Sequence, residues 1–234
     1  MTTFPEPEVS IETVVFFDID GTLIKTAGAS RASMLRALRE LYGVQANELY
    51  VDAVGRTDRA IVRDLLALHG LEPTDREVER FLARYVEYLP GELRRRPKAH
   101  VLPGVPDVLE RLSRRPDVAI GLLTGNARHG AYRKLRHFGL DHFFPFGGFG
   151  DRWLDRADVA KEALEAAEKS LGQTIDPGKC WVVGDTVHDV TCARAIGAKA
   201  IAVLTGWSLV SDLYAVGPDA VIDDLTELDT LLKC

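Results

Sequence analysis

Two aspartates stand two positions apart directly after an apolar run near the amino terminus. Residues 14–17 read VVFF and lead into Asp18, and Asp20 follows two residues later. Side chains at positions i and i+2 of an extended segment point to the same side, so this spacing predicts that both carboxylates enter one space. Two like charges in one space indicate a chemical task.

Two other apolar runs end in similar polar clusters. Residues 118–123 and 180–183 are continuously apolar, as expected for strands that are covered on both faces of a parallel sheet. The clusters that follow them are Thr124-Gly125-Asn126 and Gly184-Asp185-Thr186-Val187-His188-Asp189. Because the carboxyl ends of parallel strands lie at one edge of the sheet, we expect all three clusters to meet there.

The residue types at this edge suit a metal-assisted reaction at a phosphate group. Carboxylates bind a divalent cation, whereas glycine-exposed amides and a threonine hydroxyl suit phosphate oxygens. A carboxylate attacking a phosphate dianion about 4 Å away would meet a repulsion of roughly 8 kcal/mol at an effective dielectric constant of about 20. A divalent cation is therefore expected, and magnesium (Mg²⁺) fits a site of oxygen ligands that also receives a phosphate.

The apolar runs also predict how the chain is organised. They alternate with helical patterns along most of the chain, which is typical of a doubly wound parallel α/β sheet. The runs predicted as strands are residues 14–17, 118–123, 180–183, 200–204 and 220–222. Residues 26–100 instead hold three amphipathic helix patterns without a strand between them. We expect residues 1–25 and 101–234 to form an α/β core domain and residues 26–100 to form an inserted all-helical domain. We interpret the glycine-rich residues 144–151 as a tight turn.

The composition is that of an ordinary globular protein. The 234 residues are 46% hydrophobic and 27% charged, and the formal net charge of −6 argues against a general affinity for nucleic acid. Cys180, Cys192 and Cys234 have no metal-ligand spacing, which indicates a reducing compartment. The first residues are acidic and rich in proline, unlike a signal peptide, and no apolar run approaches about 20 residues. We predict a soluble cytoplasmic protein, a monomer or weak homodimer, without a nucleic-acid or membrane partner.

The polar clusters resemble the motifs of the haloacid dehalogenase superfamily. DIDGTLI, LLTGN and GDTVHD are similar to its first, second and fourth motifs. The resemblance implies a Rossmann-like core in which Asp18 is the nucleophile that forms an aspartyl-phosphate. It implies that Asp20 protonates the leaving group and later activates water. It also implies that magnesium is held by Asp18, the main-chain carbonyl of Asp20 and Asp185, with Asp189 behind them.

The same resemblance implies the phosphate contacts. Thr124 would donate its hydroxyl, and Gly125 and Asn126 would donate their amides. Gly21 and Thr22 complete the predicted substrate-binding set.

The third motif of the superfamily supplies a cation, and its usual spelling is absent here. The corresponding residues 151–164 read DRWLDRADVAKEAL. Arg156 is the preferred candidate, with Lys161 and Arg152 as alternatives. A cation is expected because the phosphate and the neighbouring carboxylates outweigh one magnesium ion. His188, a single imidazole at a helix start, is predicted to lie on the helix surface.

The helical insertion resembles the type-one cap of the superfamily, which closes over the site and sets the choice of substrate. Residues 55–58 resemble the cap loop that points into the site, so Arg56 is a candidate substrate contact, with a capping turn as the alternative. Residues 101–105, VLPGV, resemble the phosphoglycolate phosphatase-like and beta-phosphoglucomutase-like branch. The leading substrate is therefore phosphoglycolate or a similar compact phosphomonoester, a small phosphorylated metabolite.

Several alternative functions stay open. Dehalogenation needs no proton donor, so Asp20 argues against a dehalogenase, and the metal-site Asp185 would have no task in one. A phosphonate hydrolase of this superfamily needs a cap lysine, and residues 26–96 contain none, although Lys25 precedes them. A beta-phosphoglucomutase-like phosphotransferase would use the same residues, and a non-catalytic phosphate-binding module is the alternative outside enzymes.

Overall fold

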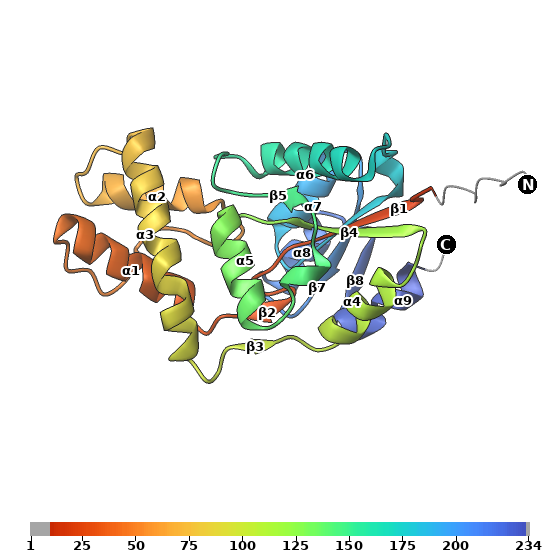
Figure 1. Ribbon diagram of the computed structural model, residues 1–234, viewed down its shortest axis with the longest axis horizontal. Helices are drawn as coiled ribbons and strands as arrows, with labels where there is room; N and C mark the ends of the chain where they lie inside the picture. The colour runs from red at the N-terminus through yellow and green to blue at the C-terminus, as the bar shows by residue number, and fades with distance from the viewer. Residues whose placement is uncertain (1–9, 233–234) are drawn as a thin grey trace, which may run out of the picture.

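The computed structural model describes residues 10–232 and shows an α/β body beside a smaller helical body (Figure 1). The proline-rich residues 1–9 and Cys234 lie outside the described residues. Among the described residues, Cys180 and Cys192 are free and buried. No helix within residues 10–232 combines the length and the apolar character needed to cross a membrane.

The α/β body is built on a six-stranded sheet with the strand order β5-β4-β1-β6-β7-β8. All of its strand pairs are parallel. The strands are β1 (Thr13–Phe17), β4 (Val118–Leu123), β5 (Gly147–Gly148), β6 (Cys180–Gly184), β7 (Lys199–Val203) and β8 (Ala220–Ile222). Phe17 at the end of β1 pairs with Leu122 of β4 and Val183 of β6, so these three central strands end at nearly the same level.

Helices cover both faces of this sheet, and alternate residues of each strand face opposite layers. Val15 and Phe17 pack on one side, whereas Val14 and Phe16 pack on the other. The first layer contains α4 (Val105–Ser113), α5 (Arg128–His137) and α9 (Leu228–Leu231), and the second contains α6 (Arg156–Leu171), α7 (Val187–Ala195) and α8 (Val210–Ala215). Three short 3-10 helices are formed by Asp141–Phe143, Pro177–Lys179 and Leu225–Glu227.

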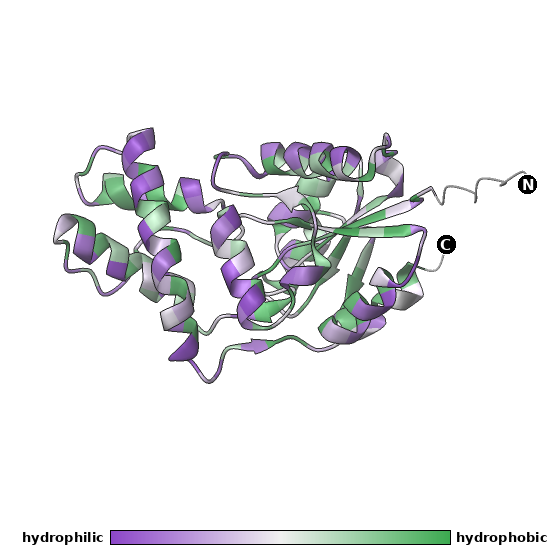
Figure 2. Ribbon diagram, in the orientation of Figure 1, coloured by the Kyte–Doolittle hydropathy of each residue, from purple (hydrophilic) through white to green (hydrophobic). Residues whose placement is uncertain are grey.

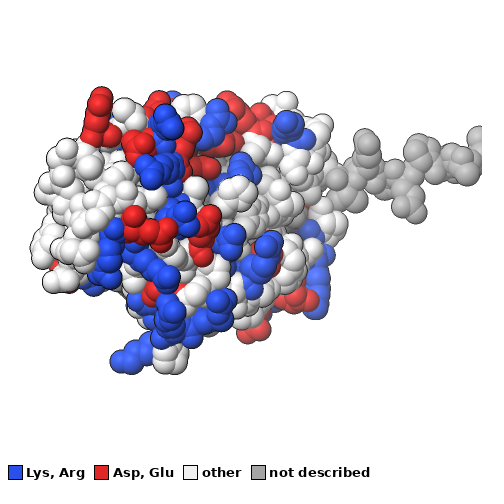
Figure 3. Space-filling model, turned by 60° about the vertical axis from the view of Figure 1, so that its left-hand side comes forward, with Lys and Arg blue, Asp and Glu red and all other residues white. Residues whose placement is uncertain are grey.

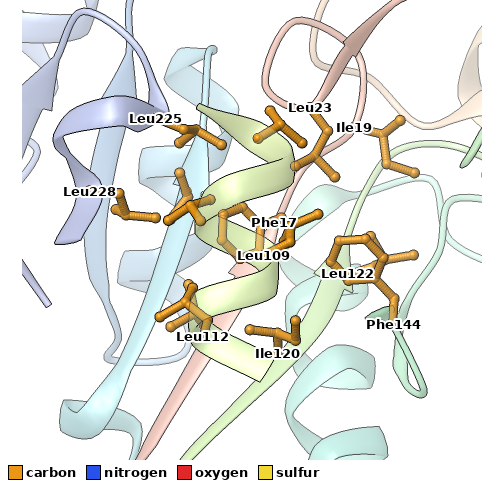
Figure 4. Packing of buried hydrophobic residues seen from close by; sticks show 14 of the residues in the cluster. Phe17, Ile19, Leu23, Leu109, Leu112, Ile120, Leu122, Phe144, Leu225 and Leu228 are labelled. Atoms are coloured by element: carbon orange, nitrogen blue, oxygen red, sulfur yellow. The ribbon is translucent and has the colours of Figure 1, made fainter. Parts of the chain in front are cut away.

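The packing of α4 shows how the first layer is held. Leu109 and Leu112 of α4 belong to one buried cluster with Phe17 of β1 and the carboxyl-terminal Leu225 and Leu228 (Figure 4). The longer strands of the six-stranded sheet are drawn mostly in the colours of apolar residues (Figure 2). Burial of this apolar surface on both faces stabilises the sheet and fixes the positions of the strand ends.

The helical body consists of α1 (Ala29–Tyr42), α2 (Asp58–Leu68) and α3 (Asp75–Arg94). Their buried faces form a separate hydrophobic cluster that includes Leu38, Leu65 and Phe81. The two connections to the α/β body pair as the antiparallel strands β2 (Ile24–Lys25) and β3 (His100–Val101). A parallel sheet with helices on both faces and an inserted helical bundle confirms the predicted fold class.

Acidic and basic side chains are interleaved on the face of the molecule seen in Figure 3. Ion pairs join charged side chains within the helical body, among them Arg59 with Asp75 at 2.5 Å and Arg84 with Glu87 at 2.8 Å.

Candidate active site

The three polar clusters follow the ends of the central strands and meet at one edge of the sheet. Asp18 follows β1, Thr124 follows β4 and Asp185 follows β6, and all three residues are buried. The backbone N–H of Asp18 donates to the carbonyl of Val183 at 2.9 Å, which extends the pairing of β1 with β6 to the nucleophile candidate. The predicted meeting of the clusters is therefore found in the structure.

Three buried aspartates form a compact acidic cluster at this edge. Asp18, Asp185 and Asp189 each offer a carboxylate oxygen, and these oxygens lie within 4.8 Å of one another. Burial, together with the charge of Asp189, raises the pKa of Asp18 to about 7. Burial and the charge of Asp18 raise the pKa of Asp185 to about 8. Burial and mutual repulsion thus disfavour the ionised form of these carboxyl groups in the absence of a cation, and their oxygen donors fit a hard divalent cation such as magnesium.

Asp189 has a supporting position within this cluster. One carboxylate oxygen accepts from the backbone N–H of Thr186 at 3.0 Å and from its hydroxyl at 2.7 Å, which forms a capping box at the start of α7. The other oxygen forms a close ion pair with the Arg156 guanidinium. Both oxygens of Asp189 are thus engaged, one of them by a cation. Asp185 has longer and uncharged contacts, because its Oδ1 accepts from the Thr22 hydroxyl at 3.4 Å and its Oδ2 from the Trp207 N–H at 3.2 Å.

Arg156 is the cation that the structure brings to the cluster. It is the first residue of α6, its side chain is only 6% exposed, and its Nη1 lies 3.8 Å from Oδ1 of Asp18. The structure does not bring the two alternatives into the site. Lys161 is 60% exposed and pairs with Asp158 at 2.9 Å, since it lies on the outer face of α6. Arg152 is also exposed, 5.5 Å from the ring centre of Trp153.

Asp20 has partners different from those of Asp18. Its Oδ2 accepts from Asn126 Nδ2 at 2.8 Å and from Lys134 Nζ at 2.6 Å. Asn126 Nδ2 also lies 2.8 Å from the Thr124 hydroxyl. The Asn126 side chain, and not only its backbone amide, therefore belongs to the site.

Lys134 is a site residue that sequence reasoning missed. It lies in α5, in a stretch whose many basic residues suggest a solvated helix. Its side chain is nevertheless only 2% exposed, because α5 buries Gly130, Ala131, Lys134 and Leu135 on one face. Lys134 follows Gly130 by four residues and Ala131 by three, so all three lie on one face of the helix. This spacing is the signal that could have identified Lys134 as buried.

The glycines and the threonine of the first two motifs lie close to the acidic cluster and to its neighbours. Gly21 has φ of +92°, and a Cβ at this position would lie 2.5 Å from Oδ2 of Asp185. A Cβ at Gly125 would overlap the carbonyl oxygen of Arg56 and lie 3.0 Å from Arg156 Nη1. Thr22 is buried, and its hydroxyl lies 3.4 Å from Oδ1 of Asp185. Thr22 therefore contacts an acidic residue of the cluster.

A cavity of about 530 Å³ lies between the two bodies, and both contribute to its lining. Asp18, Asp20 and Arg156 line it from the α/β body, and residues 48–56 line it from the helical body. Arg56 is among these residues, but its Nη1 bonds to Oδ2 of Asp64 at 2.7 Å and to the carbonyl of Asp52 at 3.0 Å. Arg56 thus lies at the cavity with its guanidinium held within the helical body.

The start of α2 binds directly to the α/β body. The backbone N–H of Asp58 donates to the carbonyl of Gly125 at 2.6 Å, and that of Arg59 donates to Gly150 at 3.0 Å. The Asp58 carboxylate accepts from the N–H of Ala127 at 2.8 Å. In this structure the helical body is therefore closed over the strand ends.

The fold and the site define a class of protein: parallel α/β enzymes with an aspartate cluster at the sheet edge beneath an inserted helical body. A family described as haloacid dehalogenase-like hydrolase matches residues 12–197, and the chain belongs to this family. The predicted family and the predicted hydrolase class are confirmed.

Named relatives agree with this assignment. The chain is 28% identical to a phosphoglycolate phosphatase of Agrobacterium fabrum, over 94% of this chain and 91% of the relative. It is 31% identical to a phosphoglycolate phosphatase of Chromobacterium violaceum, over 94% and 96%. It is also 26% identical to the pyrophosphatase PpaX of Oceanobacillus iheyensis, over 96% and 98%. Each of these relatives is named as a phosphatase, in agreement with the predicted enzyme class.

Solved structures share the fold. A protein of Haemophilus somnus described as a predicted phosphoglycolate phosphatase aligns with a TM-score of 0.70 and 21% identity, covering 95% of this chain and 98% of that chain. CbbY of Rhodobacter sphaeroides, solved in complex with phosphate, aligns with a TM-score of 0.70 and 17% identity, covering 93% and 96%.

Proposed function

We propose that the protein is a magnesium-dependent phosphatase that hydrolyses a small phosphomonoester through an aspartyl-phosphate on Asp18. The observation that carries the proposal is the position of Asp18. It is buried at the end of a central strand, beside Asp185 and the Arg156 guanidinium, and it lines the cavity together with Asp20. The proposed nucleophile, the proposed proton carrier and a cation thus surround one space, as displacement at phosphorus requires.

The proposed metal site is formed by Asp18, Asp185 and the main-chain carbonyl of Asp20, with Asp189 supporting it from behind. Bound magnesium would supply positive charge that offsets the repulsion between the carboxylates and the substrate phosphate. The acidic cluster supports this part of the proposal, because desolvation and mutual repulsion disfavour its ionised form in the absence of a cation.

The proposed reaction has two steps. In the first, a carboxylate oxygen of Asp18 bonds to phosphorus while the bond to the leaving oxygen breaks and Asp20 gives that oxygen a proton. In the second, Asp20 takes a proton from water, the water oxygen bonds to phosphorus, and the bond to Asp18 breaks. Thr124, the amides of Gly125 and Asn126, and Arg156 would hold the phosphate oxygens in both steps.

We propose residues 26–100 as the cap domain that selects the substrate. Phosphoglycolate or a similar compact phosphomonoester is the leading candidate, supported by the names of several relatives. Arg56 is positioned to reach a substrate carboxylate only if its guanidinium exchanges Asp64 for the ligand. Arg56 would then couple substrate recognition to the start of α2.

Phosphate release tests the proposal. The purified protein is incubated with phosphoglycolate, sugar phosphates, nucleotides and p-nitrophenyl phosphate, with magnesium or with a chelator. We expect release that requires magnesium and is abolished in Asp18→Asn, with phosphoglycolate among the best substrates. Release that is unchanged by chelation or by the Asp18 variant would refute the mechanism. Transfer of phosphate within a sugar phosphate without release would instead identify a phosphotransferase.

A further inference from the structure

Lys134 is a second buried cation at the site, and the steps proposed above do not use it. Its side chain is 2% exposed and it lines the cavity, although it is carried by a helix of the α/β body rather than by any of the strand-end clusters. A buried ammonium is costly unless carboxylates pair with it, so its position requires a specific set of partners.

The hydrogen bonds of Lys134 lead to the proton carrier of the proposed reaction. Nζ lies 2.6 Å from Oδ2 of Asp20 and also bonds closely to Oδ1 of Asn126. Asn126 Nδ2 donates to the same Oδ2 of Asp20 at 2.8 Å and contacts the Thr124 hydroxyl at 2.8 Å. Lys134, Asn126 and Asp20 thus form a closed triangle that is tied to a phosphate-binding residue.

This triangle holds one oxygen of Asp20 and leaves the other available. Within residues 10–232, the side-chain hydrogen bonds of Asp20 all reach Oδ2. The carboxylate is therefore anchored at one end, whereas Oδ1 can carry a proton toward the cavity. Asp20 itself is less enclosed than its partners, with 24% of its side chain exposed, so the orientation depends on these two donors rather than on packing.

The helix that carries Lys134 is itself bound by the helical body. A Cβ added at Gly130 of α5 would lie 3.5 Å from side-chain atoms of Val86 and of Leu89 in α3, so the two helices pack closely there. At the start of α5, the Ala127 N–H donates to the Asp58 carboxylate at 2.8 Å. The Lys134 ammonium also stabilises the charge of Asp58, whose pKa is raised by burial and lowered by Lys134. The position of Lys134 is thus fixed from both sides of the cavity.

We propose that Lys134 is a positioning residue that holds the Asp20 carboxyl group in the orientation needed to transfer its proton to the leaving oxygen. The inference rests on the proposed function. In the step concerned, Asp18 forms its bond to phosphorus, the leaving oxygen takes the electron pair of the broken P–O bond, and that oxygen receives the proton of Asp20. A carboxyl group that is already held in this orientation lowers the barrier to proton transfer, because Asp20 does not have to reorient during the reaction.

The inference predicts a dependence on the leaving group. An alkoxide is a poor leaving group and requires the proton of Asp20, whereas p-nitrophenolate is stable as an anion and leaves without one. Loss of Lys134 should therefore slow phosphorylation of Asp18 by an alkyl phosphate much more than phosphorylation by p-nitrophenyl phosphate. A role confined to folding or charge balance would slow both esters alike.

The experiment is a rapid-quench measurement of phosphoenzyme formation by wild type and Lys134→Met with magnesium present. The esters are p-nitrophenyl phosphate and the alkyl phosphate that the wild type hydrolyses fastest, with phosphoglycolate tried first. General acid catalysis contributes about 10²-fold or more, so we expect the alkyl rate to fall by about 10²-fold and the ratio of alkyl to aryl rates to fall at least about tenfold. Lys169→Met, at an exposed position of α6, is the matched control and should leave both rates unchanged.

Each outcome has a distinct meaning. Equal losses on both esters, or no loss, would overturn the positioning role while leaving the proposed function intact. A wild type that forms no phosphoenzyme from any ester would overturn the proposed function, and the inference with it. If thermal unfolding shows that Lys134→Met does not fold, Lys134→Gln is measured instead, and the same change in the ratio of rates is expected.

Discussion

Asp18 and Asp20 are chemically identical side chains with different surroundings. Asp18 is enclosed by the acidic cluster and Arg156, whereas Asp20 is more exposed and bound by Asn126 and Lys134. Both line the same cavity, as their spacing predicts. Surroundings that differ in this way allow one carboxylate to act as a nucleophile and its neighbour to exchange a proton.

In the proposed mechanism Arg156 holds the phosphate, and its ion pair with Asp189 also stabilises the fold, so its removal should lower both activity and stability. Loss of a group that stabilises transition-state charge typically costs about 10²- to 10³-fold in kcat, which is the decrease expected for Arg156→Ala. The variant should also lose about 3 kcal/mol of unfolding free energy, because Asp189 would keep a buried charge without its partner. Steady-state kinetics and denaturant unfolding measure the two effects.

Lys161→Ala is the comparison for this prediction. Its side chain lies on the exposed face of α6 and pairs with Asp158, so we expect activity close to that of the wild type. A severe loss in Lys161→Ala together with an active Arg156→Ala would mean that the cation has been misassigned.

At the scale of elements, the sequence patterns predict most of the sheet. The five apolar runs match β1, β4, β6, β7 and β8. The sixth strand, β5, consists of Gly147 and Gly148 and was interpreted as a turn, because two glycines carry neither an apolar signal nor a strand preference. The pairing of β2 with β3 was also not predicted, since it joins residues far apart in the chain.

In the candidate site, too, residues placed by the local sequence could be predicted, whereas residues placed by distant parts of the chain could not. Asp18, Thr124 and Asp185 were predicted because each directly follows a strand, so local sequence determines where they lie. The burial of Lys134 was not predicted, because it results from α3 packing against α5 and from a contact with Asp20, which is 114 residues away in the sequence. Arg156 could be preferred over Lys161 from its place before the helix, but only the structure shows which face of α6 each one occupies.

The contact between α2 and α5 predicts a pH dependence of stability. Burial raises the pKa of Asp58 to about 6 from its ordinary value of 3.8. The folded protein therefore keeps this proton between about pH 4 and pH 6 while the unfolded chain releases it, so the unfolding free energy falls as pH rises through this window. The change attributable to Asp58 should be about 3 kcal/mol.

Asp58→Asn isolates this contribution, because its amide oxygen can still accept from the Ala127 N–H. Denaturant unfolding of both proteins across this pH range should show a steeper loss of stability in the wild type. Parallel curves for the two proteins would refute a raised pKa at Asp58.

At the scale of the whole molecule, magnesium binding should stabilise the folded protein. The acidic cluster exists only when the three strand ends are assembled, so the unfolded chain lacks the site. At a free magnesium concentration of about 100 times the Kd, the stabilisation should be about 2.7 kcal/mol, which is measured as an increase in Tm.

Asp185→Asn should lose this magnesium-dependent increase. In chelator the variant should be at least as stable as the wild type, because it replaces a carboxyl group whose ionisation is disfavoured by burial and by Asp18 with a neutral amide. An equal increase of Tm in the variant, or none in the wild type, would contradict the proposed metal site.

If catalysis passes through a phosphoryl group on Asp18, this intermediate can be trapped. The protein is mixed with magnesium and its best phosphomonoester, quenched in acid within one turnover, and analysed by intact mass and peptide mapping. We predict one added phosphoryl group on Asp18 in the wild type. With an aryl ester, this phosphoenzyme should accumulate in Asp20→Asn, because water is no longer activated to hydrolyse it. Asp18→Asn should show no phosphoenzyme. Turnover without any phosphorylated Asp18, or phosphorylation of a different residue, would contradict the account.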